Sequence, residues 1–203
     1  MLKKRLILIR KRPDLSFKEF NEYWAGPHGR LVLGLPGLRE YVQNPVVRHH
    51  EAPDGERLVD GLAELWDDDE ADPVTAARVA GELQEDEPRF LGGLTGFSVT
   101  NLDSYDPEAK IWIVGDEPFD ANLFAAAAGA ASTGGVLETK PVNGRLMQRP
   151  GLSHEAVVPQ RILTIGTPHA AAPAVYEAAL DAVRRAAPPG RVRILLTHSR
   201  RIL

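Results

Sequence analysis

Two periods of hydrophobicity alternate along the first half of the chain, one typical of strands and one typical of helices. The run RLILIR (Arg5–Arg10) is short and rich in Ile and Leu, which predicts a strand with both faces at least partly covered. After a turn at Pro13-Asp14, Ser16 and Glu19 form a capping-box pattern that predicts the start of a helix. The residues on its apolar face recur at spacings of three and four: Phe17, Phe20, Trp24, His28, Leu31 and Leu35.

This helix contains Gly26-Pro27-His28 in its middle. Proline has no N–H, so the carbonyl of Tyr23 loses its helical partner, and Gly26 loosens the same turn. We therefore expect the helix to kink or restart there, which would re-aim His28 and leave a carbonyl free beside apolar side chains.

The rest of the first half predicts three more strands and one more helix. LREYVQNPVV (Leu38–Val47) is a strand, followed by a polar loop over His49–Arg57. VDGLAELWD (Val59–Asp67) is the next strand, because it alternates and contains an aromatic residue. Pro73–Leu83 is a helix with a further turn through Phe90, and GFSVTNLD (Gly96–Asp103) is the last strand, so the order is β-α-β-β-α-β.

The second half repeats this order. Its strands are KIWIV (Lys110–Val114), QRILTIGTP and RVRILLTH, and its helices are PFDANLFAAAAGAA, with Asp120 at the cap, and AAPAVYEAALDAVRRAA. LMQRP (Leu146–Pro150) resembles YVQNP (Tyr41–Pro45) of the first half. We predict two modules, residues 1–103 and 109–203, because modules of about 100 residues often need a partner to complete their core.

Composition and charge exclude several classes of function. The chain has 203 residues, 43% of them apolar, and a formal net charge of −4, which gives no reason to bind nucleic acid or an anionic membrane. It has no cysteine, so disulfides and thiolate chemistry are excluded. The basic start, MLKKRLILIRKRPD, has too short an apolar run for a signal peptide, and no stretch is long enough for a membrane span. These features predict a cytoplasmic protein.

His28 is the main candidate for chemistry. An imidazole titrates near neutrality, so it can take and return a proton, and Asp60 or Glu64 could fix its tautomer. Alternatively, His28 is a buried structural residue that bonds Glu64 or a backbone carbonyl.

Aromatic residues near this histidine predict the walls of a binding site. Trp24, Tyr41 and Trp66 would contact a flat or apolar ligand, with Tyr23 at the rim. The alternative is that the same aromatics are ordinary core. His49-His50-Glu51 with Asp54 has the composition of a metal site, but adjacent loop histidines rarely share one ion, so no metal is predicted.

Several separated motifs of the first half resemble the EthD family. They are Tyr23-Trp24, His28, Leu35-Pro36-Gly37-Leu38, Tyr41, Asp60-Gly61, Glu64, Trp66 and the run DEPRFL, within residues 2–103. The resemblance implies a ferredoxin-like βαββαβ module, so the expected fold class is α+β, with tandem modules forming an α+β barrel. It also implies a pocket between the helices and the sheet. The expected assembly is a pseudo-dimer within one chain, with a homodimer through another surface left open.

The second half departs from this pattern and is a degenerate copy. The position of Trp24 falls near Ala128 and that of His28 near Ser132, and QRILTIGT replaces the Asp-Gly strand. The expected chemistry is therefore confined to the first half.

Three hypotheses of function follow. The first is binding of a small apolar, aromatic or polyketide-like metabolite with cofactor-free isomerase, cyclase or oxygenase chemistry, in which His28 is the acid/base. The second is a non-catalytic accessory protein that binds a ligand or haem in an oxidative degradation pathway. RNA binding ranks last, because GFSVTNLD lacks the basic and aromatic pattern of an RNA-binding sheet.

Overall fold

The computed structural model describes residues 1–203 apart from 53–58, 69–71, 104–106, 125–126, 128, 130–135, 143–146, 156–157 and 187–189. Ala128, Ser132 and Asp54 of the sequence predictions lie outside the described residues.

The first half follows the predicted order of elements. They are β1 (Lys3–Lys11), α1 (Phe17–Tyr23), α2 (Gly29–Val32), β2 (Leu38–Ala52), β3 (Gly61–Asp67), α3 (Pro73–Asp86) and β4 (Leu91–Val99). The capping box at the start of α1 is present, because the Glu19 amide donates to Ser16 Oγ and the Ser16 amide donates to the Glu19 carboxylate.

The second half contributes β5 (Ala109–Gly115), a helical turn (Ala121–Phe124), β6 (Val136–Thr139), β7 (Arg161–Thr167), α5 (Ala172–Ala186), β8 (Val192–His198) and the short β9 (Arg200–Arg201). Asp120 accepts a hydrogen bond from the Asn122 amide at the start of the helical turn, which is the capping position that the sequence predicts.

Among the described residues, the strands form one nine-stranded sheet in the order β4-β1-β3-β2-β8-β5-β7-β6, with β9 paired to β2. Each half contains its first to fourth strands in the order 4-1-3-2, the order of a ferredoxin-like module, and the neighbours in each half are antiparallel. We propose the division into residues 1–103 and 109–203 on this repeat.

Strand β2 joins the halves. Its first part pairs with β3, its second part from Val46 pairs with β8, and the register shifts between Val46 and Arg48. The prediction of a polar loop over His49–Arg57 is therefore wrong for His49–Ala52, which belong to the part of β2 that pairs with β8.

The segment that follows β6 covers the free edge of β4. Backbone hydrogen bonds link Thr100 to Lys140, Ser98 to Val142, and Gly96 to Met147. The sheet thus curls into an α+β barrel within one chain, as predicted for a pseudo-dimer. LMQRP does not take the place of β2 in the second half; its Met147 bridges to β4 instead, and β6 is the second strand.

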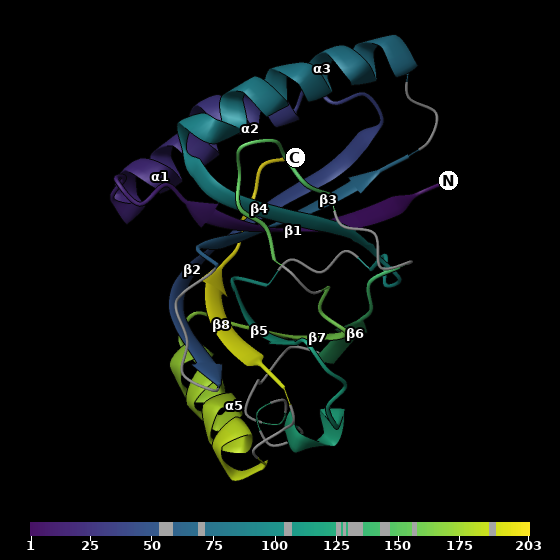
Figure 1. Ribbon diagram of the computed structural model, residues 1–203. Helices are drawn as coiled ribbons and strands as arrows, with labels where there is room; N and C mark the ends of the chain where they lie inside the picture. The colour runs from purple at the N-terminus through teal and green to yellow at the C-terminus, as the bar shows by residue number, and fades with distance from the viewer. Residues whose placement is uncertain are drawn as a thin grey trace.

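Figure 1 shows α1, α2 and α3 outside the first group of strands and α5 outside the second, so the two groups face each other between the helices. One core lies between α1–α3 and their strands, a second between α5 and its strands, and a third between the two groups of strands. In the described part of the chain, no helix combines the length and the apolar character needed to cross a membrane.

Candidate functional site

The break predicted in the first helix is a π-helical turn over Trp24–His28, which joins α1 to α2 and contains Pro27. The carbonyl of Trp24 in this turn accepts a hydrogen bond of 2.8 Å from Gln43 Nε2 of β2. Such turns change the angular spacing of side chains and are frequent at functional sites. The turn places both Trp24 and His28 among buried residues, with 1% and 7% of their surfaces exposed.

Trp24 packs directly on the backbone of β3. A Cβ atom at Gly61 would lie 2.5 Å from the indole ring, so only glycine leaves room for it. The indole N–H donates to the Tyr41 hydroxyl at 3.0 Å, and Gln43 donates to the same hydroxyl at 2.7 Å. Arg200, near the carboxyl terminus, donates to Gln43 Oε1 and lies over the indole ring, so the second half helps to fix this wall.

His28 is held by Asp86, the last residue of α3. Its Nδ1 lies 2.9 Å from Asp86 Oδ2, and the hydroxyl of Tyr23 donates to Asp86 Oδ1 at 2.6 Å. The imidazole also packs against Phe90, with 4.7 Å between ring centroids. Within the described residues Nε2 has no hydrogen-bond partner. An imidazole fixed at one nitrogen with the other available can exchange a proton with a ligand.

The carboxylate of Asp86 is stabilised in its charged form. Burial raises its pKa, but the hydrogen bonds from His28 and Tyr23 outweigh burial, so the pKa lies below its ordinary value. Asp86 is therefore favoured as a carboxylate, which can orient the imidazole of His28.

Asp86→Asn is expected to destabilise the protein above pH 5 by an amount that shrinks in acid. Because the folded-state pKa of Asp86 is depressed, its contribution is present above the unfolded-state pKa of about 3.9 and is lost as the pH falls through the folded-state pKa. Urea unfolding of both proteins from pH 6 to pH 2.5 measures this. A difference that does not change with pH would contradict the assignment.

A second acidic group lies beside the first. Glu87, in the turn after α3, is buried, and its carboxylate accepts a hydrogen bond of 2.6 Å from Arg149 Nε. Burial raises the pKa of Glu87, and the bond from Arg149 offsets only part of that effect. Arg149 comes from the segment that covers β4, so both halves contribute ionisable groups here.

These groups line a cavity between the helices and the sheet. Trp24, His28, Tyr41, Glu87 and Arg149 all contribute to its wall. The cavity measures only about 40 Å³, which holds water but no metabolite. An open groove of about 630 Å³ over β1 and β4 adjoins it, since Arg5, Ile7 and Met147 line both hollows.

Four of the predicted site residues lie at this place: His28, Trp24, Tyr41 and Tyr23. Asp60 does not contact His28 in the described contacts; it accepts a hydrogen bond from the Lys11 amide and joins β1 to the start of β3. The prediction that Asp60 or Glu64 orients His28 is therefore wrong, because Asp86 occupies that position.

Glu64 and Trp66 lie on the opposite face of β3, inside the barrel. Residues two apart share one face of a strand, and Leu62 of the same set belongs to the core between the two groups of strands. The Trp66 indole donates to the Leu102 carbonyl at 2.8 Å, so this ring is no wall of the cavity beside His28.

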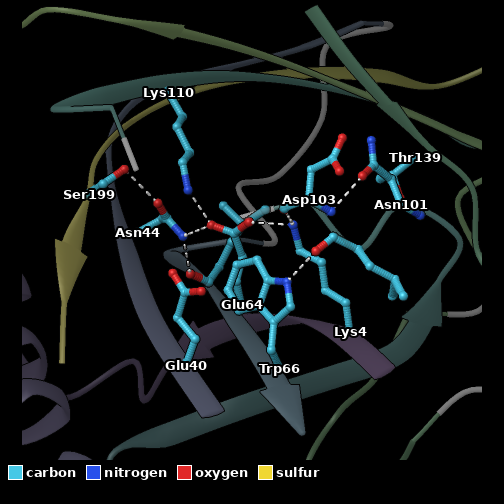
Figure 2. A network of polar contacts seen from close by, with 12 residues as sticks. Lys4, Glu40, Asn44, Glu64, Trp66, Asn101, Asp103, Lys110, Thr139 and Ser199 are labelled. Atoms are coloured by element: carbon cyan, nitrogen blue, oxygen red, sulfur yellow. Dashed lines mark hydrogen bonds and ion pairs between the residues drawn. The ribbon is translucent and has the colours of Figure 1, made fainter. Parts of the chain in front are cut away.

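Figure 2 shows Glu64 between two lysines from different halves. Lys4 of β1 lies 3.0 Å from Glu64 Oε1, and Lys110 of β5 forms an ion pair with Oε2. Asn44 donates to Oε2 at 2.9 Å, and Ser199 donates to Asn44. Glu64 is thus a buried link between the modules.

The sequence predictions missed Asp86, Glu87 and Arg149. The signal for the first two was present in the run DEPRFL, which carried part of the resemblance but was given no role. No signal pointed to Arg149, because its contact with Glu87 spans 62 residues of chain.

The segment His49-His50-Glu51, whose composition suited a metal site, lies in β2 and not in a loop. His49 and His50 are consecutive in β2, so their side chains point to opposite faces. Among the described residues, no group of three or more metal-ligating side chains is found.

Fold and site together define an α+β barrel with an ionisable cluster between its helices and its sheet. Residues 12–93 match the family model of the EthD domain, the family that the motifs of the first half resemble. A crystal structure named provisionally as a chlorite dismutase is similar over 98% of this chain and 94% of that one, with 10% identity and a TM-score of 0.44. No curated protein matches the chain.

Proposed function

We propose that the protein binds a small apolar or aromatic metabolite between α1–α3 and the sheet, and that His28 transfers a proton to or from it. The observation that carries this proposal is the His28–Asp86 pair of 2.9 Å, with Nε2 available beside the cavity. Asp86 is the positioning residue, and Tyr23 holds Asp86 in turn.

The chemistry that suits these groups is isomerisation, cyclisation or elimination. Each needs one group that removes a proton and returns it elsewhere, and His28 can do both. The neighbouring Glu87, whose pKa is raised by burial, could exchange a second proton. Oxidation of an electron-rich substrate by O₂ without a cofactor would use the same base to form the reactive anion. Polyketide-like phenols and aromatic ketones carry the acidic protons that such reactions use.

His28→Ala is expected to lower the rate of conversion about a hundredfold, the usual contribution of a general acid/base. The protein is incubated with a panel of naphthols, phenols and aromatic ketones, and products are followed by mass spectrometry. Asp86→Asn should shift the pH–rate profile while retaining part of the rate. His154→Ala, which changes an exposed histidine, is the matched control. Unchanged rates in His28→Ala would remove this residue from the mechanism.

A non-catalytic accessory role is the second candidate, and the small cavity favours it. A space of about 40 Å³ beside His28 is closed to a substrate until side chains move. Binding of panel compounds without conversion would favour this role. Haem does not fit the cavity as it stands, because a macrocycle needs several hundred Å³.

A further inference from the structure

The cavity beside His28 is too small to hold a ligand, whereas the adjoining groove is large enough. The groove over β1 and β4 measures about 630 Å³, within the range of small-molecule sites, whereas the inner cavity measures about 40 Å³. A ligand bound in the groove can reach His28 by extending past the wall that the two hollows share.

Three side chains line both hollows, and only one of them can move easily. Arg5 is held by Asp67, with 3.2 Å between Nε and Oδ1. Ile7 is β-branched and lies in the middle of β1, between β3 and β4. Met147 is unbranched and flexible, and it is only partly buried.

The backbone of Met147 is held by β4, while its flexible side chain packs at the edge of the core between α1–α3 and their strands. Its amide donates to the Gly96 carbonyl at 2.5 Å, and its carbonyl accepts from the Gly96 amide at 3.2 Å. A Cβ atom at Gly96 would lie 2.7 Å from Met147 Cε, so the thioether lies over β4 where glycine leaves space. A rotamer change of Met147 can thus join the hollows without disturbing the sheet.

We propose that Met147 separates an outer, apolar binding groove from the His28 cavity and so determines which ligands enter. The inference rests on the proposed function of His28. The ligand class is an elongated apolar molecule with a hydroxyl or carbonyl group at its leading end. Its body lies against Val99, Leu102 and Val142 in the groove, and its polar end meets His28 once Met147 turns aside.

The test uses 2-naphthol, which has an apolar body and one hydroxyl group, and naphthalene, which lacks the hydroxyl. Met147→Ala is expected to bind 2-naphthol about tenfold more tightly than the wild type, because the open state no longer has to be selected. Met147→Phe should bind it about tenfold more weakly, since a stiff ring fills the passage. Met147→Leu, which keeps the volume, is the matched control. Fluorescence titration gives the affinities, and thermal unfolding checks that each variant folds.

Equal affinities in the wild type, Met147→Ala and Met147→Phe would overturn the inference. His28→Ala separates it from the proposed function. Loss of the preference for 2-naphthol over naphthalene in His28→Ala supports contact of the hydroxyl with His28. A preference that survives in His28→Ala, together with tighter binding in Met147→Ala, would refute the role of His28 and leave the role of Met147 standing.

Discussion

Glu64→Gln is expected to lower the free energy of unfolding by about 3–5 kcal/mol, the usual effect of removing one partner from a buried ion pair. The substitution keeps the shape of the side chain but removes the carboxylate that forms ion pairs with the ammonium groups of Lys4 and Lys110. Lys110 is 1% exposed, so water cannot replace the lost carboxylate. Urea unfolding at pH 7 measures the change.

The effect of Glu64→Gln should depend on pH in a defined direction. Burial raises the pKa of Glu64, but Lys110 and Lys4 outweigh burial and lower it overall. Its stabilising contribution is therefore present above the unfolded-state pKa of about 4.3 and is lost as the pH falls through the lower folded-state pKa. The difference between wild type and Glu64→Gln should accordingly shrink in acid.

Two further variants distinguish a buried link from a general charge effect. Lys110→Met in the Glu64→Gln background removes one of the two ammonium groups that Glu64 contacts in the wild type and should recover part of the lost stability. Glu177→Gln removes an exposed partner of Arg48 and should change little, since both side chains are about half exposed. A loss below about 1 kcal/mol in Glu64→Gln would show that the network of Figure 2 does not hold the modules together.

The role of Glu64 shows why the sequence predicted a strand but not the direction of its side chains. Strand β3 is buried on both faces over nearly its whole length, so apolar residues do not alternate with polar ones. Without that alternation, the two-residue period does not show which side chains face the helices and which face the interior of the barrel. Glu64 and Trp66 therefore looked as suitable for the site as Tyr41, although they lie across the sheet from it.

Local signals in the sequence predicted local structure well. The capping box at Ser16 and Glu19 and the break at Pro27 depend only on residues within one or two turns, and both are present. Asp86 pairs with His28 across 58 residues and Arg149 pairs with Glu87 across 62, so their partners depend on how whole elements pack. The continuation of β2 past His49 likewise depends on β8, which lies in the other half.

The site itself depends on a close approach of helix and strand that two residues create together. Gly61 lets the indole of Trp24 lie on β3, and the indole donates to the Tyr41 hydroxyl. Gln43 donates to that hydroxyl and to the Trp24 carbonyl in the π-helical turn that carries His28. This explains in physical terms why an Asp-Gly pair starts β3. The close contact also implies that positions 24 and 61 are energetically coupled.

Trp24→Ala is expected to lower the free energy of unfolding by about 3–5 kcal/mol, because it empties the space of a side chain that is 1% exposed. Gly61→Ala should lower it by about 1–3 kcal/mol in the wild type, since the new methyl group would lie 2.5 Å from the indole ring. In the Trp24→Ala background the same substitution should have almost no effect, and urea unfolding of the four proteins measures this coupling.

Gly81→Ala provides the matched control for this coupling, because an added Cβ at that exposed position of α3 meets nothing within 4 Å. Alanine is favoured over glycine inside a helix, so this variant should gain up to about 1 kcal/mol, equally with or without Trp24. If Gly61→Ala destabilised both backgrounds to the same extent, the strand and not the indole would require glycine, and Trp24 would not position the turn that carries His28.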